Sequence, residues 1–259
     1  MRLHFLRNAS LIVISDDHKI LVDPMLADKG ALPPFSLFRH EPIRNPLVPL
    51  PANAMSSLAD VDTALITHCQ RGHADHLDRR GARFLARKRI PTYCRSADQN
   101  HLRKRGIDTY PLATLERQTF LGGFITEIPA RHGHGWISLV MGLGAGYFIE
   151  LPGEPSLYIA GDTVLTDHVR RVLSELKPDI AIVAAGNASV DLGNPILMTL
   201  EEVMEFASLA PGRVIANHLE ALNHCPVTRL QVYEAAQRAG LEAKIYIPDD
   251  GEILEIGSV

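Results

Sequence analysis

The sequence predicts an α+β fold in which two β-sheets pack face to face beneath outer layers of helices. Strand-like runs open the chain, and helical and strand-like segments alternate through its last hundred residues. Since a sheet buries one face and an amphipathic helix buries one stripe, strands in both halves with helices between them favour two helix-covered sheets. We expect one domain spanning residues 1–259, with enough chain for a sizeable core.

The composition is that of a folded protein. Hydrophobic residues make up 46% and charged residues 22%, and the net charge of -4 gives no reason to expect nucleic acid as a partner. Charges interrupt Met1–Arg7 too early for a secretory signal, and no apolar run is long enough to span a membrane. The three cysteines (Cys69, Cys94 and Cys225) are widely spaced, so we expect reduced thiols and a cytoplasmic protein.

The chain should begin with three short strands and a long loop. Apolar runs separated by polar turns indicate strands at Leu3–Arg7, Ser10–Ser15 and Lys19–Val22. Prolines recur through about residues 24–54, which excludes a regular helix or a central strand there. A loop this long is usually functional, so we expect this Pro-rich loop to form a lid or a wall of a substrate site. Its cationic side chains Arg39, His40 and Arg44 could contact an anion.

The rest of the chain continues with strands and helices in turn. The apolar run Val61–Ile66 reads as a buried strand. After it we expect helices at about Leu77–Arg89 and Ala97–Arg105, with a strand at Pro91–Cys94 between them. Turn residues then separate strands at Gln118–Leu121, Phe124–Ile128, Ser138–Leu143, Tyr147–Leu151 and Leu157–Ala160. The last part should hold helices near Thr166–Leu176, Leu200–Leu209 and Thr228–Ala239, and strands at Ile180–Ala184, Val214–Ala216, Ala243–Ile247 and Ile253–Ile256.

The most informative segment follows the strand-like run that ends at Ile66. Three histidines and one aspartate occur there within nine positions: His68, His73, Asp75 and His76. Imidazole nitrogens and carboxylate oxygens are ligands that suit zinc and neighbouring transition metals. A loop at the end of a buried strand can direct such groups into one cleft. The segment therefore predicts a metal site.

Several ordered motifs carry a family resemblance. His73-Ala74-Asp75-His76 matches the second half of the signature His-x-His-x-Asp-His, and His132, Asp162 and His218 each follow a strand-like run farther along the chain. On these residues the whole chain resembles the metallo-β-lactamase superfamily. Members of that family are αββα sandwiches that bind one or two metal ions at the edge between the two sheets.

The N-terminal segments favour one branch of that family. Asn8–Val13 and Ile20–Pro24 resemble the branch that contains L-ascorbate-6-phosphate lactonase-like proteins. In that branch a histidine often stands where this chain has Asn8.

The first half of the signature is altered. Without a gap, Arg71 would occupy its first histidine position, and His68 lies five residues before His73 instead of two. Either the loop bulges at Gly72 and still delivers His68, or His68 is lost and one metal position is weakened. Glycine tolerates the backbone conformation of such a bulge, so we favour the alternative in which His68 reaches the metal site.

The resemblance implies a ligand set and a reaction. His68, His73 and His132 would hold one divalent ion, Asp75, His76 and His218 would hold a second, and Asp162 would bridge them. Zinc is the expected metal, with manganese or iron as alternatives. Hydroxide formed on such ions attacks a carbonyl carbon or a phosphorus atom, and Asp75 would be the catalytic residue that receives a proton.

The substrate class stays open at this point, because one fold serves many substrates. We expect a small-molecule ester, lactone or sugar-phosphate-like compound. The alternatives are a small-molecule or phospholipid phosphodiesterase and a non-catalytic metal-binding or sensing protein. A homo-oligomer is also possible for a chain of this class.

Other polar residues near these motifs have simpler explanations. His134 could hydrogen-bond a substrate, and His224 could end a loop or cap a structure. Asp78 should cap the helix that follows it, and Cys69 should be a small buried residue beside the site. The basic residues between Arg79 and Arg89 are typical of a solvated helix face.

Overall fold

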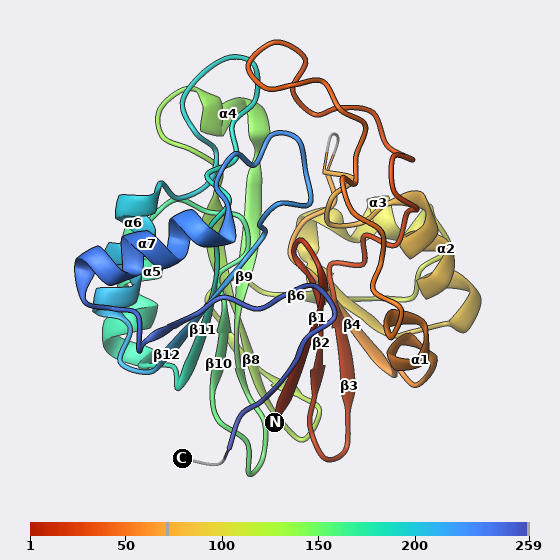
Figure 1. Cartoon of the computed structure of the whole chain (residues 1–259). Helices are drawn as coiled ribbons and strands as arrows, with labels where there is room; N and C mark the ends of the chain where they lie inside the picture. The colour runs from red at the N-terminus through yellow and green to blue at the C-terminus, as the bar shows by residue number, and fades with distance from the viewer. Residues whose placement is uncertain (71–72, 258–259) are drawn as a thin grey trace.

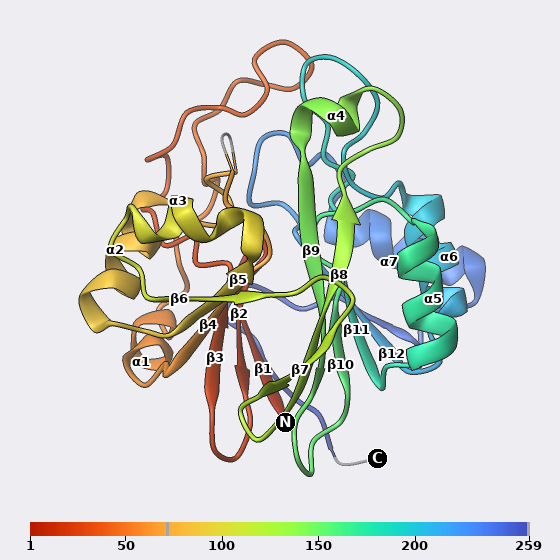
Figure 2. The ribbon, with the colours of Figure 1, turned by 180° about the vertical axis from the view of Figure 1, so that it is seen from behind.

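The computed structural model describes residues 1–70 and 73–257, and it contains two seven-stranded sheets that face each other. Figure 1 shows α1, α2 and α3 on the outer side of one sheet and α5, α6 and α7 on the outer side of the other; Figure 2 shows the same layers from behind. This arrangement confirms the predicted αββα sandwich. Across the described ranges, the helices are too short or too polar to span a bilayer.

The first sheet has the strand order β14-β1-β2-β3-β4-β5-β6. Its N-terminal strands pair antiparallel, whereas β3 to β6 run parallel, so the ends of β3 and β4 lie at the same edge. The strands are β1 (Arg2–Arg7), β2 (Ser10–Ile14), β3 (Lys19–Val22), β4 (Thr63–Ile66), β5 (Thr92–Arg95), β6 (Thr109–Leu112) and β14 (Ile253–Glu255). The helices on this sheet are α1 (Ala54–Ala59), α2 (Arg79–Lys88) and α3 (Gln99–Arg103), with a 3-10 turn at Ser96–Asp98.

The second sheet has the order β13-β12-β11-β10-β9-β8-β7. Its strands β10 to β13 are parallel, and β7 to β10 are antiparallel. The strands are β7 (Arg117–Phe120), β8 (Gly123–Arg131), β9 (Leu143–Glu150), β10 (Leu157–Ile159), β11 (Ile180–Ala184), β12 (Arg213–Asn217) and β13 (Ile245–Tyr246). The helices are α5 (Asp167–Arg171), which continues as a π-helical turn at Val172–Leu176, α6 (Leu200–Leu209) and α7 (Arg229–Ala239).

Apolar side chains from the inner faces of both sheets form the central core. Leu11 and Val22 of the first sheet belong to the same buried cluster as Tyr147, Ile149 and Ile182 of the second. Burial of such side chains is the main stabilising term for a sandwich. The three cysteines are free thiols, as expected.

One predicted strand is wrong. The segment 138–143 was expected to be extended, but Ile137–Met141 forms the helix α4 and β9 begins only at Leu143. Apart from Ser138, the run Ile137–Met141 is apolar, and so short an apolar run does not distinguish a strand from a helix. Gly142, with φ of +78°, separates the helix from β9.

Two elements were not predicted. The strand β6 contains Pro111, which removes a backbone donor, but β6 is the edge strand of its sheet, where proline is tolerated. The helix α1 is only six residues long and directly follows the Pro-rich loop.

The Pro-rich loop, residues 24–53, is attached to the second half of the chain at several points, of which Asn223 and Asp191 make the most contacts. The Asn223 side chain accepts hydrogen bonds from the Phe35 backbone N–H and from Asn45, and it donates to the carbonyls of Ser36 and Glu41. The Asp191 carboxylate accepts hydrogen bonds from the Ser36 hydroxyl, at 2.6 Å, and from the backbone N–H groups of residues 37–39. These contacts support a wall more than a lid. In Figure 1 the loop passes over the upper ends of the sheets.

A buried arginine fixes the two ends of this loop to the first sheet. Arg7, at the end of β1, is 1% exposed and donates to the carbonyls of Met25, Ala27 and Val48 at 2.8–3.0 Å. Burial lowers the pKa of Arg7 to about 10, while Asp78 and Asp250 oppose that shift. The guanidinium therefore stays charged at neutral pH.

Replacing Arg7 by Met should destabilise the protein by about 3 kcal/mol or more, because three buried carbonyls lose a charged donor. Denaturant unfolding of Arg7→Met measures this loss. Arg2→Met is the matched control, since Arg2 lies on the same strand and is exposed. Equal stability of the two variants would show that Arg7 does not anchor the loop.

Candidate metal centre

All seven predicted ligands lie at one edge of the sandwich, each after a strand. His68, His73, Asp75 and His76 belong to the segment that follows β4 of the first sheet. His132 follows β8, Asp162 follows β10 and His218 follows β12, all in the second sheet. The strand ends of the two sheets thus deliver donors to one region.

Gly161 allows the close approach that positions Asp162. Its φ is +65°, and a Cβ at this position would lie 2.3 Å from the Ala145 carbonyl oxygen. Any residue other than glycine would displace the β9 backbone, and with it the carboxylate that follows.

The first group of donors consists of His68, His73 and His132. Their candidate ligand atoms lie within 4.8 Å of one another, and all three side chains are buried. His68 Nε2 is 3.1 Å from His73 Nδ1, and the His132 ring centroid is 4.7 Å from that of His68 and 4.8 Å from that of His73.

The second group consists of Asp75, His76, Asp162 and His218, again buried and within 4.8 Å of one another. Asp162 Oδ2 is 3.0 Å from His76 Nε2 and 3.5 Å from His218 Nε2. The same oxygen is 3.7 Å from His132 Nε2 in the first group. Asp162 therefore has the position that a bridging ligand requires.

The lengthened motif still brings His68 to the site. The predicted bulge at Gly72 falls on residues 71–72, outside the described part of the chain. His68 is nevertheless 1% exposed beside His73, and its Nδ1 lies 3.0 Å from the Thr67 hydroxyl.

Asp23 orients the second group, and the sequence analysis did not identify it. The His76 ring is held by a 2.8 Å hydrogen bond between its Nδ1 and Asp23 Oδ2. Thr67 donates to the same carboxylate from its backbone N–H, at 2.8 Å, and from its hydroxyl, at 2.6 Å. A carboxylate that accepts the remaining N–H of a metal-binding histidine fixes the ring and directs its other nitrogen to the metal. In the sequence, Asp23 is an acidic residue at the end of a strand and part of the family-like segment Ile20–Pro24, but neither feature assigns it a partner.

Asn8 and Cys225 also support ligands. The Asn8 side-chain amide donates to the Asp75 backbone carbonyl at 3.3 Å, and the Asn8 backbone carbonyl accepts from the His218 backbone N–H at 3.2 Å. The Cys225 thiol lies 3.4 Å from His218 Nδ1. Asn8 thus has a structural role where the lactonase-like branch often has histidine.

The remaining candidates lie outside the two groups. His134 is exposed and its Nε2 is 2.9 Å from Glu202 Oε1. His224 is buried and packs edge-on against Phe35 with 5.3 Å between the ring centroids. Asp78 caps α2 by accepting from the Gly81 N–H, and Cys69 is buried, both as predicted.

The two groups differ in electrostatics. Burial, together with the neighbouring imidazoles, holds the pKa of His68 well below its usual value and lowers that of His73 to about 4. Both are therefore neutral at pH 7, which is the form that binds metals. Burial alone would lower the pKa of His76 too, but Asp162, Asp75 and Asp23 raise it well above the usual value. In the second group, the negative charge of the carboxylates thus outweighs the effect of burial on the pKa of His76.

The donors fit one or two divalent metal ions. Both ring nitrogens of His132, Nε2 of His218 and Oδ1 of Asp162 are buried and have no hydrogen-bond partner among the described residues. Burying such atoms without a partner is costly, and a cation between them would remove the cost. Nitrogen and carboxylate oxygen donors suit zinc, manganese and iron.

Comparison with known proteins identifies the family. A family model described as a beta-lactamase superfamily domain matches residues 18–219. The chain belongs to the metallo-β-lactamase superfamily. The UPF0173 protein YddR of Bacillus subtilis is 32% identical over 257 residues, covering 97% of this chain and 98% of that protein. A UPF0173 metal-dependent hydrolase of Rubrobacter xylanophilus is 26% identical over 92% of this chain and 88% of its own length.

Solved structures agree with this assignment. Isothiocyanate hydrolase from Delia radicum gut bacteria superposes with a TM-score of 0.89 at 31% identity, covering 99% of both chains. A possible metal-dependent hydrolase from Veillonella parvula gives a TM-score of 0.90 at 25% identity, again over 99% of both chains. The protein is therefore a metal-dependent hydrolase of this fold. The comparisons do not single out the lactonase-like branch.

Replacing His68 by Ala should lower the metal content from two ions per chain to about one, because the first group loses one of its three nitrogens. Elemental analysis of the purified protein measures this content. His134→Ala, in the exposed histidine, should keep both ions. An unchanged content in His68→Ala would remove His68 from the ligand set.

Replacing Asp23 by Asn should weaken metal binding roughly 10- to 100-fold, since the His76 ring loses its charged hydrogen-bond acceptor. Competition with a chelator measures the affinity. Asp17→Asn on an exposed turn should bind metal like the wild type. If Asp23→Asn also does so, Asp23 does not orient the site.

Proposed function

We propose that the two groups of donors hold two divalent metal ions, with zinc as the expected metal, and that the protein hydrolyses a small molecule at an electrophilic carbon or phosphorus atom. One observation supports this most directly. Seven buried donors form two groups, each within 4.8 Å, and Asp162 reaches both. Metal ions in such a site lower the pKa of a coordinated water to about 7 and stabilise charge that develops on the substrate.

Asp75 is the proposed proton acceptor. Its Oδ2 lies 3.6 Å from His76 Nε2 and 3.7 Å from His218 Nε2. Burial would raise the pKa of Asp75, but the nearby imidazole of His76 and that of His218 lower it below the usual value. The carboxylate is therefore ionised at neutral pH, as a general base requires.

The surroundings of the site favour a substrate with an apolar body. Met141, the last residue of α4, places its carbonyl 3.3 Å from His73 Nε2, so α4 lies directly beside the first group. Trp136, Leu139 and Val140 on this helix are 57%, 86% and 70% exposed. Exposed apolar side chains next to a catalytic centre are typical of a surface that contacts substrate.

Two of the cations that the sequence placed in the Pro-rich loop, Arg44 and His40, are engaged within the protein. Arg44 donates to the carbonyls of Gly30 and Ala31 at 2.7 and 3.0 Å, and His40 Nε2 lies 2.8 Å from the Ser189 hydroxyl. Neither of these two side chains is thus free to bind a phosphate group. For this reason we favour a small ester or lactone over a sugar phosphate.

An isothiocyanate is the second candidate substrate. It is suggested by the 31% identity to isothiocyanate hydrolase over 99% of both chains. Addition of water to the central carbon of R–N=C=S and cleavage of its C–N bond give the amine R–NH2 and carbonyl sulfide. This carbon is electrophilic like a carbonyl carbon, and an aryl or alkyl group R meets the requirement for an apolar body.

A substrate panel tests the proposal. The metal-loaded wild type should hydrolyse at least one of 4-nitrophenyl acetate, γ-decalactone and benzyl isothiocyanate, followed by release of nitrophenol, acid or amine. Asp75→Asn should lose at least about a hundredfold in kcat, because general-base catalysis contributes at least that much. His134→Ala should retain the wild-type rate.

The metal content of Asp75→Asn is measured beside its rate. Two retained ions with a lost rate would assign Asp75 to proton transfer, whereas a lost ion would assign it to metal binding. No turnover of the whole panel by metal-loaded protein would contradict the proposed substrate class, and an unchanged Asp75→Asn rate would contradict the role of Asp75.

A further inference from the structure

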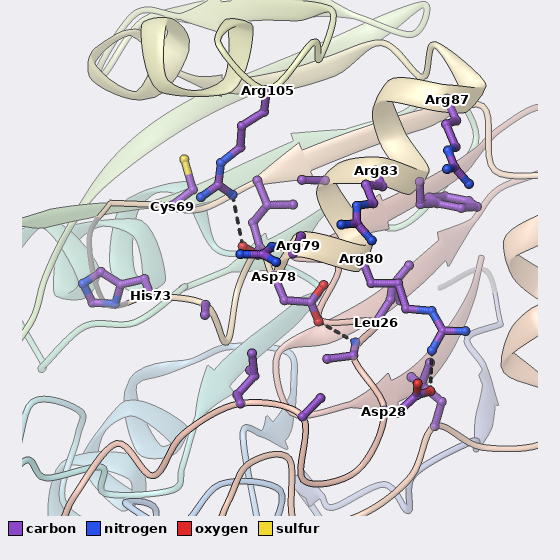
Figure 3. Close-up of a pocket in the computed structure, with 18 of the residues that line it drawn as sticks. Leu26, Asp28, Cys69, His73, Asp78, Arg79, Arg80, Arg83, Arg87 and Arg105 are labelled. Carbon is purple, nitrogen blue, oxygen red and sulfur yellow. Dashed lines mark hydrogen bonds and ion pairs between the residues drawn. The ribbon is translucent and has the colours of Figure 1, made fainter.

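A pocket lies on the outer side of the first sheet, beside the metal centre. It has a volume of about 1380 Å³ and lies between α2, α1 and the first residues of the Pro-rich loop. Figure 3 shows His73 at one end of this α2 groove and Arg87 toward the other. His73 is buried, so its ring separates the groove from His68 and His132.

A stripe of arginines lines the groove. Arg79, Arg83 and Arg87 follow one another at intervals of four residues along α2, which places them on one face of the helix. All three are exposed, and none makes a hydrogen bond or an ion pair with a described residue. Figure 3 shows their guanidinium groups around the groove.

Helix stability does not account for this stripe. Like charges four residues apart repel one another, and Arg79 in the first turn also faces the positive end of the helix dipole. Arg87, in the last turn, is favoured by the negative end of the dipole, so the cost of the stripe falls mainly on Arg79 and Arg83, where a nearby anion would reduce it.

The acidic residues of the groove are already engaged. Asp28 pairs with Arg80, and the Asp78 carboxylate accepts hydrogen bonds from the N–H groups of Gly81 and Ala27. Neither carboxylate is left to neutralise the arginine stripe.

Much of the remaining lining is apolar, although Gln70, Lys88 and Arg105 also line the groove. The groove floor includes Leu26, Leu32, Met55, Leu58, Leu77 and Phe84. Met55 is 63% exposed, an unusual position for a long apolar side chain beside a cationic helix face. The α2 groove thus combines an apolar floor with an unpaired cationic edge.

We propose that the α2 groove binds an amphipathic carboxylate, with its aliphatic chain on the apolar floor and its carboxylate on the arginine stripe. Arginine suits this role because its planar guanidinium can donate two parallel hydrogen bonds to one carboxylate. The proposal goes beyond the hydrolytic reaction, and binding in the groove does not require turnover at the metal centre.

Titration calorimetry with sodium decanoate tests this site on the metal-loaded protein. The wild type should bind one decanoate per chain, and octanoate should bind several-fold more weakly because less apolar surface is buried. The double variant Arg83→Gln/Arg87→Gln should weaken decanoate binding roughly tenfold, at two- to fivefold for each exposed ion pair. Glutamine keeps the helix propensity of α2.

The control is Arg238→Gln, in an exposed arginine of α7 on the other side of the sandwich. It should bind decanoate like the wild type. Binding of the neutral 1-decanol as tight as that of decanoate would overturn the role of the arginines. The site itself would be overturned by unchanged decanoate binding in the double variant, or by no binding to the wild type.

Discussion

The architecture of the site depends on one imidazole held between carboxylates from the two sheets. His76 Nδ1 lies 2.8 Å from Asp23 at the end of β3, and His76 Nε2 lies 3.0 Å from Asp162 at the end of β10. This ring therefore connects the first sheet to the second at the edge where the donors meet. Because the protein interior has a low effective dielectric, these charge-assisted contacts are strong, and a shift of either sheet would break one of them. The relative position of the sheets and the geometry of the second group are thus set together.

The same edge of the sandwich concentrates polar groups that a hydrophobic core could not contain. Deeper between the sheets, residues such as Leu11, Tyr147 and Ile182 pack without charge. At the edge, buried ring nitrogens of His132 and His218 and one oxygen of Asp162 lack partners among the described residues. Burying these unpaired polar atoms lowers the stability of the fold, and the apolar packing beneath the site compensates for this loss. Metal binding in this family fold is therefore a source of stability as well as of chemistry.

Much of this arrangement was predictable because its signals are local. A histidine-rich loop directly after an apolar run identified the site, and the choice of His132 over His134 followed from its place directly after β8. The role of Asp23 was not predictable, because it arises from the parallel pairing of β3 with β4, which brings Asp23 beside Thr67 and His76. The strand predicted at 138–143 is wrong because the apolar residues of this short segment show neither the helical nor the strand period. The segment forms the helix α4 beside the site. The arginines of α2 are exposed, as expected for a solvated helix face, but the sequence does not show that the first residues of the Pro-rich loop line the same groove.

The loop of residues 73–78 serves both the metal centre and the α2 groove. His73, Asp75 and His76 face the donors, and Asp78, two residues later, caps α2 and holds the Ala27 N–H of the Pro-rich loop. The helix α2, which carries the arginine stripe, thus begins three residues after the candidate ligand His76. Its N-cap, Asp78, also holds Ala27 on the opposite side of the groove. An anion bound along that stripe would relieve the repulsion within α2 and stabilise its first turn. Because the first turn of α2 and the Ala27 N–H both depend on Asp78, an anion bound in the groove would also stabilise the loop that carries His73, Asp75 and His76.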